Sequence, residues 1–468
     1  MFLNWRFLQP KARGVHLYNT KSKKKEILKP LKAPLVSIYS CGPTVYGPVH
    51  VGNLRSYVFA DTLHRTLTVA GYKPKHVINI TDVGHLTDDA DFGDDKVEKE
   101  AAKQKRSAKE ITEEYTQAFM DDLDALNIVR GRYQFPKATD HITEQIEIIE
   151  ALEEKGHTYK TKDGVYFDTD TFPTYGELGG VNLAQLQEGA RVDVGEKKNA
   201  ADFALWKLSG GAKRLQEWDS PWGIGFPGWH LECSAMAISH LGEQIDIHTG
   251  GEDHIYTHHN NEIAQSESAT GKTFASIWMH NAFLNFGGEK ISKSLGNTTL
   301  LKELDHPMAL RYLFLEAHYR TPQSFTKESL AGAERALGRL HLFADSLKDV
   351  KETYVANEYL NKFKEAIFDD LNTPKALALM WEMVRDADVS KGAKKKTLSR
   401  MDRVLGLEIF GHRLKIKIPH EVQALAEKRE EYREKKDFKK ADELRDLIKE
   451  KGFVVKDSDE GFIVEKLN

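Results

Sequence analysis

The segment 50–53 combines residue types that can bind phosphate. His50, Gly52 and Asn53 follow a turn and stand at the start of a region with helical spacing of apolar residues. A glycine at a helix N-terminus lets phosphate approach the backbone N–H groups, and histidine and asparagine can donate hydrogen bonds to oxygens on which charge develops. We therefore expect His50 and Asn53 to act on phosphates, although this short motif alone is a weak signal.

A cationic segment with the sequence KISKSLGN occupies residues 290–297. Lys290 and Lys293, on a loop flanked by glycine, suit a clamp that closes over a polyphosphate. An ordinary exposed turn has a similar composition, so the segment gains weight only beside a second phosphate-binding motif. Together, the segments at 50–53 and 290–297 predict a site that activates a nucleotide.

A third group of residues has the chemistry of a metal site. His258 and Glu262 are four residues apart and would share one helix face, and Cys41 and Cys233 are the two cysteines of the chain. Two thiolates, an imidazole and a carboxylate are ligands that zinc accepts. Other possible donors are His230, His248, His254 and His259. A helix would turn His259 about 100° away from His258, which argues against both binding one metal. The alternative to a zinc site is that the cysteines are ordinary core residues and the histidines lie on the surface.

Two strands and a helix would position these residues. The apolar run LVSIYS at 35–40 predicts a buried strand, the spacing over 49–70 predicts a helix that ends at Gly71, and 76–81 predicts a second strand. Strand, helix and strand within about fifty residues form the βαβ unit that begins a parallel sheet. The metal and phosphate residues would then lie near the ends of its strands.

The rest of the chain adds an insertion and a helical end. Ser107 with Glu110 predicts a capping box, a helix is expected over 142–155, and β structure is expected at 164–168 and 246–248. Helices follow from Asp305, and 424–451 predicts a helical hairpin broken near Asp437. The segment 82–95, rich in aspartate and glycine, is expected to be a solvated loop.

Composition limits the broad class of protein to which the chain can belong. With 468 residues, 40% apolar, the chain should form several domains, and its net charge of −4 gives no global basic excess for nucleic acid. Two cysteines in a long chain argue for a reducing compartment. Because no apolar run suits a signal peptide or a membrane span, we expect a cytoplasmic protein with no membrane contact.

Four sequence runs resemble the cysteinyl-tRNA synthetase family, which belongs to the class I aminoacyl-tRNA synthetases. These runs are YSCGPTVYGPVHVGN, FPGWHLECSAMAISHLG, DIHTGGEDHIYTHHNNEIAQSE and KISKSLGN. Segments 50–53 and 290–294 are similar to the HIGH and KMSKS signatures of class I, with Asn53 in place of the final histidine and Ile291 in place of methionine. The similarity extends over nearly the whole chain.

The resemblance implies roles for individual residues. Its zinc ligands would be Cys41, Cys233, His258 and Glu262. Lys293 would contact ATP, together with His50, Gly52 and Asn53, and Lys290 would help to close over the phosphates. The amino-acid pocket would include Thr81, Trp229 and Asp253. The chain departs from the family in its acidic loop at 83–95 and in Thr257, where the family often has proline.

The resemblance also implies a fold and a division into domains. The fold class would be α/β, a Rossmann-like parallel sheet with an inserted connective domain, followed by a helical bundle and a small anticodon-binding region. The expected divisions are 1–129 for the first half of the catalytic domain, 130–225 for the insertion, 226–300 for the second half, 301–410 for the bundle, and 411–468 for a helical hairpin with a small β tail.

The implied reaction joins cysteine to tRNA(Cys). ATP with Mg²⁺ would activate L-cysteine to cysteinyl-adenylate, and the 3′-terminal adenosine of the tRNA would accept it. One zinc ion per chain would select cysteine over serine by binding its thiolate, because pocket size alone separates such pairs by only about 1–3 kcal/mol. We expect a monomer. The alternatives are a cysteine ligase of mycothiol-type biosynthesis, an inactive tRNA-binding paralogue, and a zinc hydrolase.

Overall fold

The computed structural model describes most of the chain as two compact units. The described residues are 14–84, 96–180, 196–210, 214–286, 289–290, 298–411, 420–435, 437–458 and 461–466. The first unit combines Met1–Leu301 with Met308–Phe410, and the second combines Lys302–Pro307 with Gly411–Asn468. Within the described part of the chain, no helix has both the length and the apolar character that a membrane span requires.

A five-stranded parallel sheet forms the centre of the first unit. Its strand order is β11-β10-β3-β4-β5, and every neighbouring pair is parallel. The strands are β3 (Leu35–Ser40), β4 (Lys73–Ile78), β5 (Tyr133–Gln134), β10 (Ile245–Gly251) and β11 (Ala275–Asn281). Because β3 is apolar and almost fully buried, it lies at the middle of the sheet, as expected for a parallel sheet covered on both faces.

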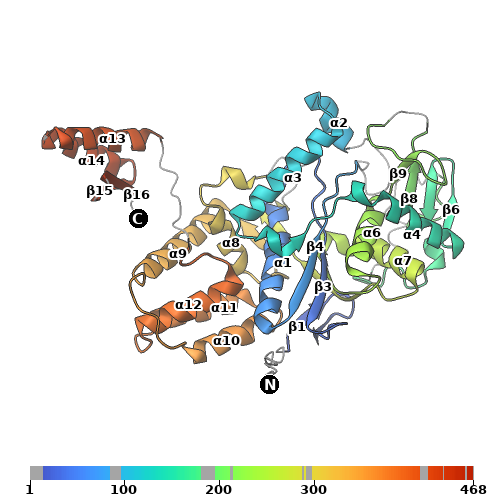
Figure 1. The fold of residues 1–468 in the computed structure, drawn as a ribbon, viewed down its shortest axis with the longest axis horizontal. Helices are drawn as coiled ribbons and strands as arrows, with labels where there is room; N and C mark the ends of the chain where they lie inside the picture. Colours follow the sequence, from blue (N-terminus) through green and yellow to red (C-terminus); the bar gives the residue numbers. More distant parts are fainter. Residues whose placement is uncertain are drawn as a thin grey trace, which may run out of the picture. The chain divides into compact units, whose positions relative to one another are not determined.

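Helices cover both faces of this sheet (Figure 1). On one face lies α1 (Val51–Ala70), and on the other lie α6 (Trp229–Leu241) and α7 (His258–Thr270). The predicted helix C-terminus is confirmed. Gly71 adopts φ 99°, and its N–H donates hydrogen bonds to the carbonyls of Leu67 and Thr68. A core of apolar side chains, including Tyr39, Met236 and Trp278, fills the space between the sheet and α6 with α7.

Between β5 and β10 of the parallel sheet, the chain forms a separate antiparallel sheet. Its order is β6-β7-β8-β9, with strands β6 (Thr158–Lys160), β7 (Gly164–Phe167), β8 (Phe203–Leu208) and β9 (Gly225–Pro227). The helices that precede it are α2 (Lys96–Gln104), α3 (Ala108–Ala125) and α4 (Ile142–Glu154). The predicted capping box at Ser107 and Glu110 is present at the start of α3.

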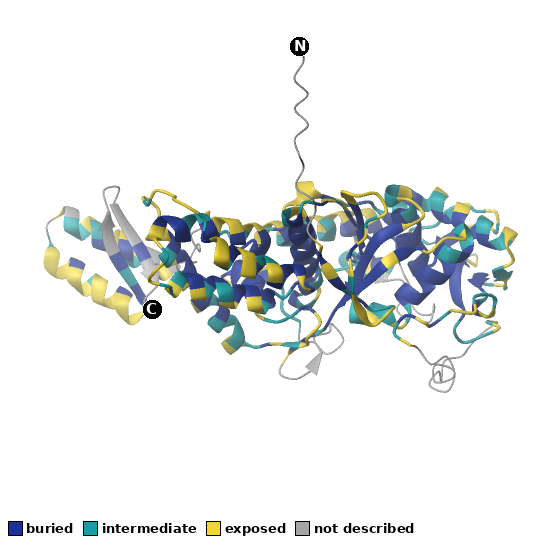
Figure 2. Cartoon of the chain, turned by 90° about the horizontal axis from the view of Figure 1, so that it is seen from below, coloured by how far each residue is buried: buried dark blue, intermediate teal, exposed yellow. Residues whose placement is uncertain are grey.

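Small sheets and a helical bundle complete the first unit. The minor strands are β1 (His16–Asn19) with β2 (Lys24–Ile27), and β12 (Leu284–Phe286) with β13 (Glu289–Lys290) and β14 (Gln323–Phe325). The bundle contains α8 (Pro307–Glu316), α9 (Lys327–Asp345), α10 (Asn357–Phe368), α11 (Thr373–Arg385) and α12 (Lys391–Leu405). Figure 2 shows the bundle helices buried on their inner sides and exposed outside.

The second unit is a helical hairpin followed by a β-hairpin. It contains α13 (His420–Glu434), α14 (Phe438–Glu450), β15 (Phe453–Ser458) and β16 (Gly461–Lys466). The break predicted near Asp437 is observed, and Asp437 caps α14. Val422, Ala426, Ile448 and Val455 belong to a small apolar core of its own.

Candidate active site and metal centre

A cavity of about 520 Å³ opens at the carboxyl ends of the central strands. In open α/β sheets, ligands bind outside these ends, so the position is that of an active site. Its lining includes Cys41, and the N-cap and first turn of α1 contribute His50, Gly52 and Asn53. The other lining residues include Thr44, Tyr46, Trp229, Gly251, Asp253, His254 and the segment 281–284.

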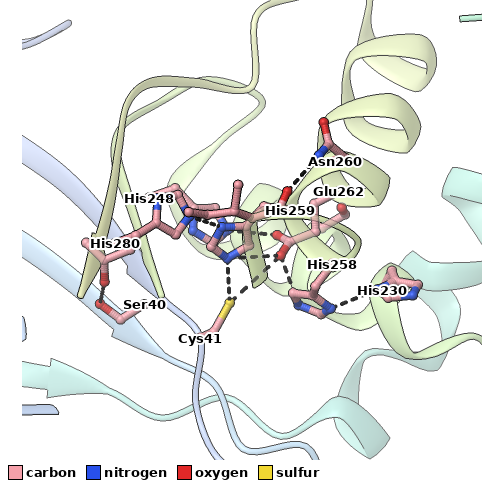
Figure 3. Close-up of polar contacts among 12 residues, drawn as sticks. Ser40, Cys41, His230, His248, His258, His259, Asn260, Glu262 and His280 are labelled. Carbon is pink, nitrogen blue, oxygen red and sulfur yellow. Dashed lines mark hydrogen bonds and ion pairs between the residues drawn. The ribbon is translucent and has the colours of Figure 1, made fainter. Parts of the chain in front are cut away.

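Four predicted metal ligands from distant parts of the chain lie together beside this cavity. Cys41 follows β3, Cys233 is on α6, and His258 and Glu262 occupy the first two turns of α7. One ligand atom from each lies within 4.8 Å of the others, and all four residues are buried. His258 Nε2 is 3.0 Å from Glu262 Oε1, and Cys41 Sγ is 3.8 Å from the same oxygen (Figure 3).

A second set of donors shares two of these residues. Cys41, His248, His259 and Glu262 also place four ligand atoms within 4.8 Å. His248 Nε2 is 2.8 Å from Glu262 Oε2, and His259 Nε2 is 3.3 Å from Cys41 Sγ. His259 therefore reaches the cluster as well as His258: the two ring centroids are 5.7 Å apart, and Glu262 Oε1 lies 3.0 Å from His258 Nε2 and 3.9 Å from His259 Nε2 (Figure 3).

The parallel pairing of β10 with β11 builds the wall behind this centre. The register places His248 opposite Trp278 and Gly250 opposite His280. The rings of His248 and Trp278 stack with centroids 4.5 Å apart, and His280 Nε2 is 2.7 Å from His259 Nδ1. These contacts fix the orientation of the imidazoles next to Glu262.

The electrostatics of the four-residue set suit a bound cation. Burial raises the pKa of the Cys41 thiol well above its usual range, whereas the hydrogen bond from Cys41 lowers the pKa of Cys233 to about 6. Burial opposes the charge on His258, yet Glu262 and Cys233 raise its pKa to about 10. Burial also opposes the charge on Glu262, but His248 and His258 hold the pKa of its carboxyl below the usual range. A buried thiolate and carboxylate carry the charge that a divalent ion neutralises, so the donor set fits zinc.

The N-terminus of α1 lies at the cavity and is suited to binding phosphate. His50 caps this helix: its Nδ1 accepts from Asn53 N at 3.3 Å, and Asn53 Oδ1 accepts from His50 N at 3.1 Å. Since Nδ1 is an acceptor, the proton of the neutral imidazole lies on Nε2, which is a donor. The capping box therefore holds a ring N–H and an amide NH₂ at a helix N-terminus, where anions bind.

Arg55 connects α1 to the opposite wall of the cavity. Its guanidinium donates to the carbonyls of Ala282 and Phe283 at 2.8 and 2.7 Å, and to Thr321 O at 2.6 Å. Glu252 Oε1 accepts from Phe283 N at 2.8 Å. Since Ala282 and Phe283 line the cavity, this buried arginine links α1 to that wall.

The other predicted site residues occupy different positions. Trp229 and Asp253 line the cavity, and the Trp229 ring lies 4.7 Å from that of His258, centroid to centroid. Thr81 is buried behind Thr44 and is not among the lining residues; its hydroxyl accepts from Asn79 Nδ2. Lys290 ends β13, but its side chain and Lys293 lie outside the described residues, as does the acidic segment 85–95.

Sequence analysis missed Arg55 and His280 and the capping role of His50 and Asn53. The spacing of His50 and Asn53 by three residues is that of a capping box, which could have been noted beside their chemistry. Trp278 and His280 alternate along β11, a pattern that places both on one face of a strand. No local signal indicates that Arg55 reaches carbonyls more than two hundred residues away.

Comparison with protein families assigns three parts of the chain. The model described as "tRNA synthetases class I (C) catalytic domain" matches residues 27–335, the DALR domain matches 362–411, and the cysteinyl-tRNA ligase anticodon binding domain matches 417–462. The methionyl-tRNA synthetase of Mycobacterium tuberculosis, solved with methionyl-adenylate, covers 80% of this chain and 90% of its own at a TM-score of 0.54 and 16% identity, which supports the fold.

The fold and the family models define a class I aminoacyl-tRNA synthetase. A cysteine–tRNA ligase of Burkholderia lata is 46% identical over 453 residues and covers 95% of both chains. A cysteine–tRNA ligase of Treponema denticola is 41% identical over 482 residues, covering 95% of this chain and 98% of its own. The chain belongs to the cysteine–tRNA ligase family.

Proposed function

We propose that this enzyme joins L-cysteine to tRNA(Cys) in two steps. The carboxylate of cysteine attacks the α-phosphorus of ATP, held with Mg²⁺, and the bond to the β-phosphate breaks to release pyrophosphate. A hydroxyl of the 3′-terminal adenosine of the tRNA then takes the aminoacyl group and AMP leaves. The observation that carries the proposal is one cavity whose lining includes both the N-terminus of α1 and Cys41 of a donor set with two thiols.

The chain's own residues position and stabilise phosphate in this scheme. His50 Nε2 and the amide of Asn53 donate to phosphate oxygens as negative charge develops, and the backbone at Gly52 permits close approach. Lys290 and Lys293 are proposed to close over the β- and γ-phosphates. Removal of one such donor costs about 3 kcal/mol in the transition state.

We propose Cys41, Cys233, His258 and Glu262 as the ligands of one zinc ion. A bound zinc ion would offer a coordination position to the substrate thiolate, which a serine hydroxyl fills poorly. The set with two thiols is favoured over the set with His248 and His259 because soft ligands select zinc. His248 forms a hydrogen bond with the second carboxylate oxygen of Glu262 and is therefore placed to orient that ligand.

The substrate cysteine is proposed to lie between this centre and the helix N-terminus. Trp229 lies beside His258 and supplies an apolar wall, and the Asp253 carboxylate at the rim is suited to the substrate ammonium group. Thr81 would act indirectly, since it is buried behind Thr44.

We infer the partners and the location from the family. The substrates would be ATP, L-cysteine and tRNA(Cys), the enzyme a cytoplasmic monomer, and the domain divisions those expected from the sequence. The matched anticodon-binding domain favours a tRNA substrate over an amino-sugar acceptor.

Cysteine-dependent ATP–pyrophosphate exchange tests this function, followed by charging of tRNA with the same preparation. We expect exchange with cysteine and at least a hundredfold lower kcat/KM with serine, then stoichiometric charging of tRNA(Cys). Comparable exchange with serine would contradict selection by the thiolate. Exchange without tRNA charging would instead support a cysteine ligase with another acceptor, and absence of both would support an inactive paralogue.

A further inference from the structure

A second, larger cavity lies toward the C-terminal end of α1. Its volume is about 710 Å³, and its walls come from α1, α10, α12 and the 3-10 helix η1 (Arg130–Arg132). The helical stretch from His50 to His64 spans about 21 Å at 1.5 Å per residue. The two cavities share no lining residue, so this one is separate from the proposed nucleotide site. We call it the α1–α12 cavity.

Cations outnumber acids on the walls of the α1–α12 cavity. The cationic lining residues are Arg65, Arg132, Lys364, Arg400 and Arg403, and the acidic ones are Asp402 and Glu408. The Asp402 carboxylate already accepts the backbone N–H groups of Leu407 at 2.7 Å and Ile409 at 2.9 Å. The lining therefore has an excess of positive charge at a concave surface, which concentrates anions.

Three of the arginines lack an acidic partner among the described residues. Arg132, Arg400 and Arg403 are exposed, and no carboxylate of the described chain lies within ion-pair distance of them. Arg130, two residues from Arg132, pairs with Asp124 at 2.7 Å and does not line the cavity. The unpaired cations come from η1 and α12, elements far apart in the sequence, and converge on one recess.

His64 adds a buried polar group to this recess. The residue is 6% exposed, and its Nδ1 has no hydrogen-bond partner in the described part of the chain. Burial, with smaller contributions from Arg132 and Arg65, lowers the pKa of His64 to about 4 against the opposing effect of Asp61. A neutral imidazole at pH 7 can donate one hydrogen bond. In the tautomer that is protonated at Nδ1, this nitrogen would donate a hydrogen bond to an acceptor in the recess.

We propose that the α1–α12 cavity binds a small phosphorylated anion with at least two negative charges. The volume lies in the range of small-molecule sites, and guanidinium groups bind phosphate in bidentate geometry. An RNA backbone would be matched by a stripe of cations along an open face, whereas these cations surround a recess with a buried histidine.

A bound anion would join the catalytic sheet's helix to the bundle. Arg65 of α1 already donates to Asn127 O at 2.6 Å and to Arg403 O at 3.4 Å. An anion bridging Arg65, Arg132 and Arg403 would add charge-assisted bonds across the same junction. Ligand binding should therefore raise the melting temperature of the protein.

Calorimetric titration with inorganic tripolyphosphate tests the proposal. The full chain is first saturated with a non-hydrolysable cysteinyl-adenylate analogue, which fills the adenylate part of the proposed nucleotide site but leaves its β- and γ-phosphate part open. We therefore expect tripolyphosphate to protect the peptide 399–408 from hydrogen exchange independently of any protection at residues 50–53, with an affinity at 399–408 that falls as salt rises. The double variant Arg400→Ala/Arg403→Ala should bind at least tenfold more weakly.

Arg385→Ala is the matched control. Arg385 is exposed on α11 outside the cavity lining, so its removal should change affinity less than twofold. No binding of tripolyphosphate by the wild type, or equal binding by the double variant with an unchanged melting temperature, would overturn the proposal. It would equally be overturned if the double variant lost tenfold in kcat/KM for tRNA while tripolyphosphate binding stayed the same, because the arginines would then serve RNA.

Discussion

At the scale of single residues, Cys233 and His259 distinguish the two donor sets around Cys41 and Glu262. We predict that Cys233→Ser loses stoichiometric zinc during dialysis against a chelator, because a hydroxyl replaces a thiolate ligand. His259→Gln should keep its zinc, since the proposed ligand set does not include it. Metal analysis by mass spectrometry measures both.

The control is Cys41→Ser. Because Cys41 belongs to both donor sets, this variant should lose zinc whichever set binds the metal. Melting temperatures of the metal-free proteins show whether the variants fold. If His259→Gln lost its metal while Cys233→Ser retained it, the set containing His248 would be correct.

Asn53 has a capping role and a proposed catalytic role that substitution can separate. Asn53→Asp keeps an oxygen for the His50 N–H and places a carboxylate at a helix N-terminus, so stability should not fall. The same change replaces an amide donor by an anion facing the phosphates. We predict a loss of about a hundredfold in pyrophosphate exchange, or about 3 kcal/mol.

Asn53→Ala provides the comparison for this prediction. It removes cap and donor together and should cost about 1 kcal/mol of stability in addition to activity. Exchange by Asn53→Asp within threefold of the wild type would show that Asn53 serves only the helix cap.

At the scale of elements, one buried carboxylate ties α1 to the bundle. Asp61 Oδ2 accepts from Arg65 Nε and Arg311 Nη2, both at 2.6 Å, and Tyr133 donates to Oδ1 at 2.7 Å. Asp61→Asn would leave two buried guanidiniums without their counter-charge. We predict a loss of about 3–5 kcal/mol in the free energy of unfolding, measured by urea titration.

Asp124→Asn is the matched control, because the Asp124–Arg130 pair is half-exposed and should contribute less than about 1 kcal/mol. Burial opposes the charge on Asp61, but Arg311 and Arg65 lower the pKa of its carboxyl to about 2. Its stabilisation is therefore full above about pH 4, the pKa of an unfolded aspartate, and is lost as the pH falls toward 2. Equal stability of the two variants at pH 7 would contradict the structural role.

Local patterns predicted elements well where one physical signal dominated. The strand at Leu35–Ser40 is observed at the predicted residues, because a short apolar run between turns has few alternatives. The second strand, expected over 76–81, runs over Lys73–Ile78 instead. Its first residues are polar or proline and carry no apolar signal, but Pro74 pairs with Val36 in the parallel register. Ile80 and Thr81 leave the ladder and form isolated bridges with Lys137 and Thr44.

At the scale of the whole molecule, the site depends on pairings that no local pattern contains. Spacing alone could place His258 and Glu262 on one helix face, but not bring Cys41 and Cys233 to them. That proximity follows from β3 and β10 being neighbours while α6 and α7 cover the same face. For the same reason, the approach of His259 to Cys41 could not be predicted from the helix alone.

The division into two compact units separates two activities of the proposed enzyme. The cavity, the donor set and the α1–α12 cavity all lie within the first unit, and the second has its own apolar core. We predict that a chain ending at residue 411 keeps cysteine-dependent pyrophosphate exchange within about threefold. Its kcat/KM for charging tRNA should fall about a hundredfold, or about 2.7 kcal/mol, because the matched anticodon-binding domain is absent.

Exchange and charging measured on the same preparation separate binding of tRNA from chemistry. The melting temperature of the shortened chain serves as the control for folding, since α13 and α14 pack on each other and on the β-hairpin of the second unit. A parallel fall in exchange and charging would mean that the second unit supports the catalytic site itself. Undiminished charging would mean that the first unit alone selects its tRNA and that residues 412–468 are not needed for tRNA recognition.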